Sequence, residues 1–122
     1  MYFTTATTLL ALSAIPLSLA AECGGYGLCG VVPSASRNQL YAIRQHVCGD
    51  TDKWRGAGSH YANGGCLRWP NWGESNAQQV CWDAFENILN QCRPEGSGLG
   101  YHYGSWTLNG KQYSVSGCSN GC

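Results

Sequence analysis

Eight cysteines in a chain of 122 residues constrain the fold more than any other feature. They stand at positions 23, 29, 48, 66, 81, 92, 118 and 122. An even number of cysteines in a small secreted chain predicts four disulfides, although spacing alone leaves their pairing open. A domain of this size has a thin core. Each disulfide closes a loop in the unfolded chain, which stabilises the fold by roughly 3 kcal/mol in the chain-entropy model. A metal role is not expected, because the paired Cys and His spacings of zinc sites do not occur.

The N-terminal segment predicts export, and it carries no charged side chain. Its apolar run at residues 9–17 is far shorter than the roughly 20 residues that span a bilayer. Ser18 and Ala20 are the small residues that a signal peptidase requires before its cut. We therefore expect residues 1–20 to be a signal peptide and residues 21–122 to form one secreted, extracellular domain in which the cysteines stay oxidised.

Two segments carry helix signals. The first begins with a capping-box pattern at residues 36–39, continues with apolar residues at helical spacing and ends at Gly49. The second begins with the same pattern at residues 75–78 and stops at Pro94. Its apolar stripe comprises Val80, Cys81, Ala84, Phe85, Ile88, Leu89 and Cys92.

Asn-Gly pairs at residues 63–64 and 109–110 predict two β-hairpins with primed turns. The first hairpin places His60 opposite Leu67 on one face. The second has a polar face and an apolar face, and the apolar face comprises Trp106, Leu108, Tyr113 and Val115. The order strand, helix, hairpin, helix, hairpin predicts an α+β fold: an antiparallel sheet with two helices packed on one face, an α/β sandwich held by four disulfides.

Charge and motifs exclude several classes of function. Seven Lys and Arg residues balance seven Asp and Glu residues, so the chain lacks the basic surface that binds nucleic acid. A small secreted ribonuclease is the most plausible enzyme, and its candidate residues are His46, His60, His102, Glu74 and Arg68. Because His60 and His102 fall on the apolar faces of their hairpins, structural roles are commoner for them. We expect no catalytic residue, no cofactor and no metal.

A cluster of aromatic and basic residues is the candidate binding site, and it comprises Lys53, Trp54, Arg55, Arg68, Trp69 and Trp72. Trp and Arg are favoured in binding hot spots, because they present a large rigid area at little entropic cost. A patch of this type suits a receptor, a channel mouth or a glycan. The alternative interpretation is that these rings fill a thin core.

Three segments share their cysteine spacing with a known family. Residues 23–30 match a C-x5-C-G opening, residues 38–49 match a first helix that ends in Cys-Gly, and residues 81–92 match a second helix bounded by cysteines. A closing strand that ends in cysteine fits residues 113–118. In these features the chain resembles the killer toxin type 4 of virus-infected smut fungi and its secreted relatives in other fungi.

The resemblance implies an α/β sandwich and a set of disulfides. Carried over by position, the pairs are Cys23–Cys92, Cys48–Cys81 and Cys66–Cys118, which leaves Cys29 for Cys122. This last pair departs from the family, in which the partner cysteine follows the second helix in a C-x-x-C that here ends in Glu95. An additional bridge of the toxin does not occur in this chain.

The resemblance also implies inhibition of calcium channels on competing cells, through a basic surface with a lysine two residues before the cysteine that matches Cys66. Gly64 occupies that position here, and the chain is neutral. We predict a secreted, monomeric, non-enzymatic killer-toxin-like protein or effector with an antagonistic or virulence role. Its partner would be an extracellular protein or membrane protein of another cell, such as a channel. The alternatives are a glycan- or cell-wall-binding module and, less favoured, a small secreted ribonuclease.

Overall fold

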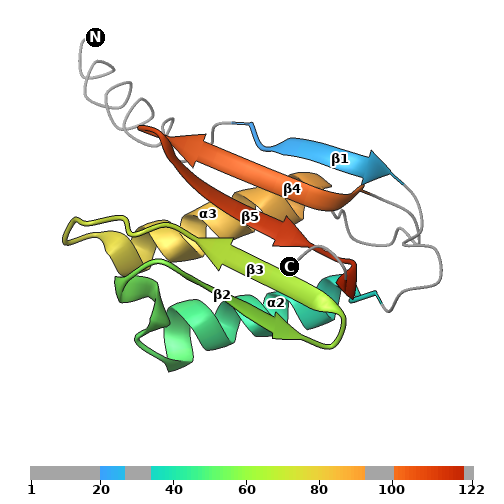
Figure 1. Cartoon of the computed structure of the whole chain (residues 1–122), viewed down its shortest axis with the longest axis horizontal. Coiled ribbons are helices and arrows are strands. Elements are labelled where there is room, and N and C mark those ends of the chain that lie inside the picture. Colours follow the sequence, from blue (N-terminus) through green and yellow to red (C-terminus); the bar gives the residue numbers. More distant parts are fainter. Residues whose placement is uncertain (1–19, 27–33, 93–100, 120–122) are drawn as a thin grey trace, which may run out of the picture.

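An antiparallel sheet with two helices behind it forms the body of the chain (Figure 1). The computed structural model describes residues 20–26, 34–92 and 101–119. The predicted signal peptide, apart from Ala20, therefore lies outside the described residues. Neither helix in the described ranges has the length and apolarity of a bilayer-spanning segment.

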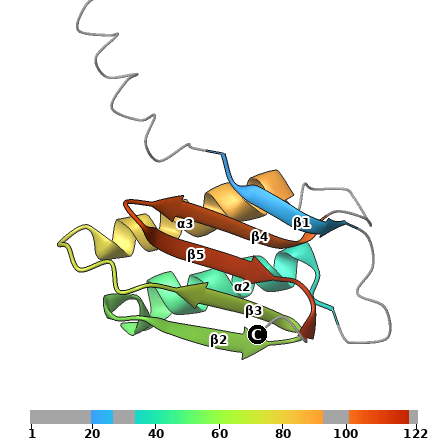
Figure 2. The ribbon, with the colours of Figure 1, turned by 45° about the horizontal axis from the view of Figure 1, so that its top comes forward.

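Within the described ranges, five strands and two α-helices follow one another in the predicted order. The elements are β1 (Glu22–Tyr26), α2 (Arg37–Gln45), a π-helical turn (His46–Asp50), a 3-10 turn (Lys53–Arg55), β2 (Gly58–Ala62), β3 (Gly65–Trp69), α3 (Ala77–Cys92), β4 (Tyr101–Leu108) and β5 (Lys111–Ser116). The strand order is β1-β4-β5-β3-β2, and every neighbouring pair is antiparallel. Both helices lie on the same face of the sheet (Figure 2). The predicted α+β class and its one-sided helices are confirmed.

Both predicted hairpin turns form as expected. Asn63 and Gly64 join β2 to β3 with φ values of 54° and 86°, while Asn109 and Gly110 join β4 to β5 with φ values of 54° and 77°. Positive φ at both central residues is the geometry of a type I′ turn, and Asn and Gly adopt it at little cost. The first turn sets the predicted pairing of His60 with Leu67.

The capping box of α2 is confirmed at its first turn. The Ser36 hydroxyl accepts a hydrogen bond from the backbone N–H of Gln39 at 3.1 Å, and the Gln39 side chain accepts one from the Ser36 N–H at 2.8 Å. These two bonds satisfy N–H groups that have no partner inside the helix. The first helix therefore begins where the sequence predicts.

The end of α2 differs from the prediction. The α-helix stops at Gln45 and continues as the π-helical turn, so Gly49 lies inside that turn and not after the helix. The Thr51 hydroxyl donates to the carbonyl oxygens of His46 and Val47 at 3.0 and 3.3 Å, which satisfies groups that the end of a helix leaves open. A Cβ at Gly49 would lie 2.7 Å from a Trp82 ring carbon. Close approach of α3 is therefore the reason for glycine here.

The capping box predicted for the second helix is wrong. α3 begins at Ala77, and the Val80 N–H donates to the Asn76 carbonyl oxygen at 3.0 Å, so Asn76 and not Ser75 precedes the helix. The Gln78 amide N–H donates to the Cys48 carbonyl oxygen at 2.9 Å, which joins the start of this helix to the π-helical turn. The predicted apolar stripe of this helix is confirmed, because every one of its residues is buried.

The core lies between the helices and the sheet. From β4 and β5, Trp106, Tyr113 and Val115 are buried there, whereas Leu108 is partly buried at the margin. The Tyr113 ring meets the Phe85 ring edge-on, with centroids 5.5 Å apart, and burial raises the pKa of Tyr113 to about 12. The predicted apolar face of the second hairpin therefore packs on α3.

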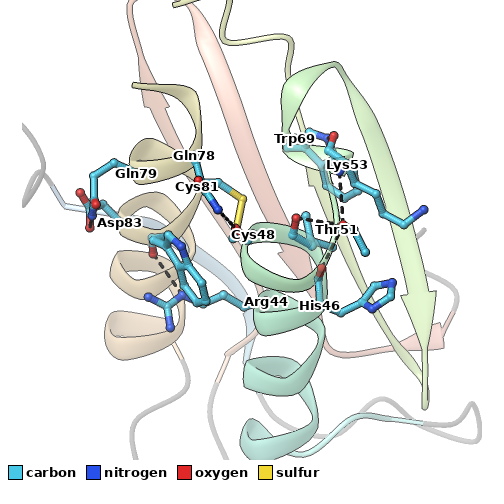
Figure 3. Close-up of a disulfide and its surroundings, with 12 residues drawn as sticks. Arg44, His46, Cys48, Thr51, Lys53, Trp69, Gln78, Gln79, Cys81 and Asp83 are labelled. Carbon is cyan, nitrogen blue, oxygen red and sulfur yellow. Dashed lines mark hydrogen bonds between the residues drawn. A yellow bond between two sulfur atoms is a disulfide. The ribbon is translucent and has the colours of Figure 1, made fainter. Parts of the chain in front are cut away.

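Two disulfides join α3 to the rest of the molecule, and both pairs are as the resemblance implies. Cys23–Cys92 ties β1 to the end of α3, and Cys48–Cys81 ties the π-helical turn to the first half of α3 (Figure 3). Cys66 and Cys118 are also disulfide-bonded. The pairing of those two cysteines, and that of Cys29 with Cys122, stays a prediction, because residues 29 and 122 lie outside the described part of the chain.

Candidate functional site

The helix-free face of the sheet carries a row of polar side chains that crosses all five strands. The cross-strand register aligns, from β2 to β1, Ser59, Arg68, Ser114, Ser105 and Glu22. Directly opposed residues share a face, and successive residues of a strand alternate between faces. Since the neighbours of Arg68 on β3 are buried under the helices, this row stands on the opposite side.

A groove of about 530 Å³ lies on this side of the sheet. Its volume falls within the roughly 300–1,000 Å³ of small-molecule sites. Its lining comes from four strands and the adjoining loops, and comprises Ala57, Gly58, Ser59, Arg68, Trp69, Pro70, Tyr103, Gln112 and Ser114. Arg68 lies between Ser59 and Ser114 in the row. Of the described residues that line the groove, Arg68 is the one with a charged side chain.

Arg68 differs from the other arginines in the described ranges. The guanidinium of Arg37 lies 4.8 Å from the centre of a tyrosine ring, and Arg44 and Arg55 form ion pairs with carboxylates at 3.6 and 3.7 Å. Arg68 is exposed and, within the part of the chain that the structure describes, has no ion pair, hydrogen bond or ring contact. Its charge and its five N–H donors are free for a ligand.

Two exposed tyrosines stand in the neighbouring row. Tyr61 on β2 and Tyr103 on β4 are 51% and 42% exposed. The register places both on the helix-free face, with Cys66 and Ser116 between them. Tyr103 lines the groove, so an aromatic ring stands beside its polar floor.

The predicted aromatic and basic cluster is divided by the fold. Trp69 and Trp72 are only 6% and 5% exposed and belong to the core. The Trp69 indole N–H donates to the carbonyl oxygens of Lys53 at 2.9 Å and Gly56 at 2.6 Å (Figure 3). That ring therefore holds the 3-10 turn against the sheet. For these two tryptophans the structure supports the alternative interpretation of core filling, while Arg68 lies across the sheet from the turn.

The remaining residues of the cluster stay together on the 3-10 turn. The Arg55 guanidinium lies 4.4 Å from the Trp54 ring centre and pairs with Asp52. Trp54 and Arg55 line a smaller hollow of about 200 Å³ beside the start of α3. Lys53 is exposed on the same turn. Because Arg55 already has an acidic and an aromatic partner, this hollow offers less free binding capacity than the groove.

Two histidines meet on the helix-covered side, at the outer edge of the sheet. The His46 and His60 ring centroids lie 4.6 Å apart, and the rings come from the π-helical turn and from β2. The pKa of His60 is lowered, first by burial and then by the charges of His46 and Lys53. A charge on His46 or Lys53 therefore opposes protonation of His60.

Of the candidate ribonuclease residues, the structure brings His46 and His60 together and places Arg68 and Glu74 elsewhere. Arg68 pairs with Ser59, whereas His60, the next residue on β2, pairs with Leu67. Arg68 and His60 therefore lie on opposite faces of the sheet. Glu74 lies at the smaller hollow, and the side chain of His102 lies outside the described residues. Among the residues that are described, no three His, Cys, Asp or Glu side chains are grouped as metal ligands.

Several groove residues were missed by the sequence analysis. Ser59, Tyr103, Gln112 and Ser114 surround Arg68, yet none of them was a candidate binding residue. The alternation of the second hairpin indicates that Gln112 and Ser114 are on its polar face. The missing information is that β3 pairs with β5, which places Arg68 beside Ser114. No local pattern reports that pairing.

Comparison of the chain with known protein families, with curated proteins and with solved structures gave no match.

Proposed function

We propose that the protein is a secreted, non-enzymatic recognition protein of the killer-toxin type. It binds a target on the surface of another cell, in an antagonistic or host-directed role, through the helix-free face of its sheet. The observation that carries this proposal is the groove of about 530 Å³ with the unpaired, exposed Arg68 on its floor.

The construction of the groove supports binding. Its floor is formed by β3 and β5, which are inner strands with a hydrogen-bonded neighbour on each side. Disulfides tie α3, behind the sheet, to β1 and to the π-helical turn. A floor that is already ordered loses little conformational entropy when a ligand binds, and more of the contact energy appears as affinity.

The position that matches the family's lysine argues for a different contact residue. Gly64 occupies it, lies in the β2–β3 turn and is buried. A buried glycine offers no side chain and no charge to a channel. We therefore assign the principal contact to Arg68, on the face of the same hairpin.

The test uses the protein secreted from a eukaryotic host, labelled and added to fungal and plant cells. Saturable binding is expected, with Arg68→Gln binding about tenfold more weakly or worse, since charge-assisted hydrogen bonds are lost. Arg55→Gln is the matched control, because it removes the same charge from the smaller hollow.

Two outcomes contradict the proposal. Equal cell binding by wild type and Arg68→Gln excludes the helix-free face as the binding site. Growth of both fungal and plant cells at the wild-type rate in the presence of saturating protein excludes the toxin role.

A further inference from the structure

We infer that the helix-free groove binds an acidic oligosaccharide, a chain of pyranose sugars that carry carboxylates, with Arg68 paired to a carboxylate. This inference rests on the proposed function and names the chemical class of the target on the other cell. It follows from three properties of the groove, which are a single free cation, a floor of hydroxyl and amide groups, and an aromatic wall.

The cation selects the charged group of the ligand. The planar guanidinium of Arg68 can form two parallel hydrogen bonds with a carboxylate, a geometry that a lysine ammonium cannot reproduce. Among the described residues that line the groove, none is acidic. The nearest acidic residue in the row, Glu22, is separated from Arg68 by β5 and β4. An anionic ligand therefore meets attraction on the floor without a carboxylate beside it.

The polar floor matches sugar hydroxyls. Ser59, Gln112 and Ser114 each present a group that donates and a group that accepts. Within the described part of the chain, none of these side chains has a hydrogen-bond partner in the protein. A pyranose ring presents hydroxyls that both donate and accept along its edge. Free Ser and Gln groups beside one cation therefore fit a sugar acid better than an apolar ligand.

The aromatic wall matches the apolar face of a sugar ring. Tyr103 is 42% exposed and lines the groove. A tyrosine ring presents a rigid apolar face with a polar tip. The C–H groups on one side of a pyranose can pack against that face, while its hydroxyls reach the floor.

The same geometry disfavours an extended peptide as the ligand. A peptide that adds to a sheet gains its affinity from main-chain hydrogen bonds at an exposed strand edge. The edge strand β2 lines one side of the groove, but its charged floor lies on the inner strands β3 and β5, each of which has a hydrogen-bonded strand on both sides. The free edges belong to β1 and β2. A ligand centred on Arg68 and Ser114 therefore meets side chains and no free strand edge, which suits an oligosaccharide.

The experiment measures binding of defined hexasaccharides by calorimetry. The probes are hexamers of galacturonic, glucuronic and mannuronic acid, and the methyl ester of each, which has the same ring but no charge. At least one acid is expected to bind, with its ester about tenfold to a hundredfold weaker, since a charged hydrogen-bonded pair is lost.

Variants locate the site. Arg68→Gln is expected to reproduce the loss seen with the ester, Arg68→Lys to restore only part of the affinity, and Tyr103→Ala to weaken binding severalfold. Arg55→Gln should bind as wild type does. Because Arg68 is exposed, its variants are expected to unfold at the wild-type temperature, so a loss of binding cannot be assigned to unfolding.

The outcomes separate this inference from the proposed function. If none of the acids binds, or if acid and ester bind equally, the oligosaccharide inference is wrong even where cell binding depends on Arg68. If cell binding resists glycan-degrading enzymes but is lost after surface proteolysis, the target is an acidic protein, and the inference is likewise wrong. If Arg68→Gln changes neither cell binding nor hexamer binding, both the proposed function and the inference fail.

Discussion

Arg68 and Trp69 are neighbours in the chain, and their side chains lie on opposite faces of the sheet. Successive side chains of a strand point to opposite faces, so the buried Trp69 ring necessarily sends Arg68 to the helix-free side. The indole N–H of Trp69 is used by two carbonyl oxygens of the 3-10 turn. Trp69 therefore holds the 3-10 turn against the sheet, and Arg68 is free for a ligand.

At the same scale, the His46–His60 pair predicts a loss of stability in acid. Burial and the nearby charges lower the pKa of His60 below its ordinary value of 6.5. The folded protein therefore binds this proton less readily than the unfolded chain does. The contribution of neutral His60 to the free energy of unfolding is complete above about pH 6.5. This contribution declines as pH falls through that value and levels off below the folded-state pKa.

Melting temperatures at about pH 7.5 and about pH 5 measure this effect, because the unfolded histidine titrates between them. The wild type is expected to have a lower melting temperature at the acid pH. The melting temperature of His60→Gln is expected to fall by less over the same interval. If the melting temperatures of both proteins depended identically on pH, the surroundings of His60 would not oppose its protonation.

At the scale of the elements, glycines on the sheet decide how closely the helices approach. A Cβ at Gly65 on β3 would lie 2.6 Å from Leu40 and 2.8 Å from Ala35. A Cβ at Gly104 on β4 would lie 2.6 Å from Ile88. Both helices therefore contact backbone at these positions, where any side chain would have to displace a buried neighbour.

Gly65→Ala is expected to destabilise the fold by about 1–3 kcal/mol, because it overpacks the contact between β3 and α2. Chemical denaturation of the variant measures the change in the free energy of unfolding. Gly56→Ala is the matched control, since its Cβ would meet nothing within 4 Å and its backbone is extended at φ −135°. A Gly65→Ala variant as stable as this control would refute the close approach of α2.

At the scale of the whole molecule, α3 is the element to which the other parts are joined. It packs behind β4 and β5, and its two cysteines are bonded to β1 and to the turn after α2. The Cys48–Cys81 bond closes a loop across the first hairpin, with a sequence separation of 33. The groove lies on the other side of the sheet from this bond.

Replacing Cys48 and Cys81 together by serine is expected to lower the free energy of unfolding by about 2–4 kcal/mol, chiefly by releasing the unfolded chain. Because the strand ladder forms the floor of the groove, cell binding well below the melting temperature is expected to stay near the wild-type level. Loss of binding while the double variant is still folded would show that this disulfide also shapes the groove.

Much of the fold follows from the sequence because its signals are local. The Ser36 capping box, the two Asn-Gly turns and the apolar stripe of α3 each act within a few residues, and all three are confirmed. Together they predict two helices and two hairpins, and hence the α+β class. The capping box predicted at Ser75 shows the limit, because α3 begins at Ala77 and the Gln78 side chain donates to the distant carbonyl of Cys48.

The sequence by itself determined which segments are helices, which are hairpins and which faces are apolar. Only the tertiary structure decided that β3 pairs with β5, and this pairing places Arg68 beside Ser114 and opens the groove. It also decided that Trp69 and Trp72 are buried, while Tyr103 is exposed. The physical reason is that pairing between hairpins depends on how the helices pack behind the sheet. Those contacts join segments that are far apart in the sequence, and no short pattern encodes them.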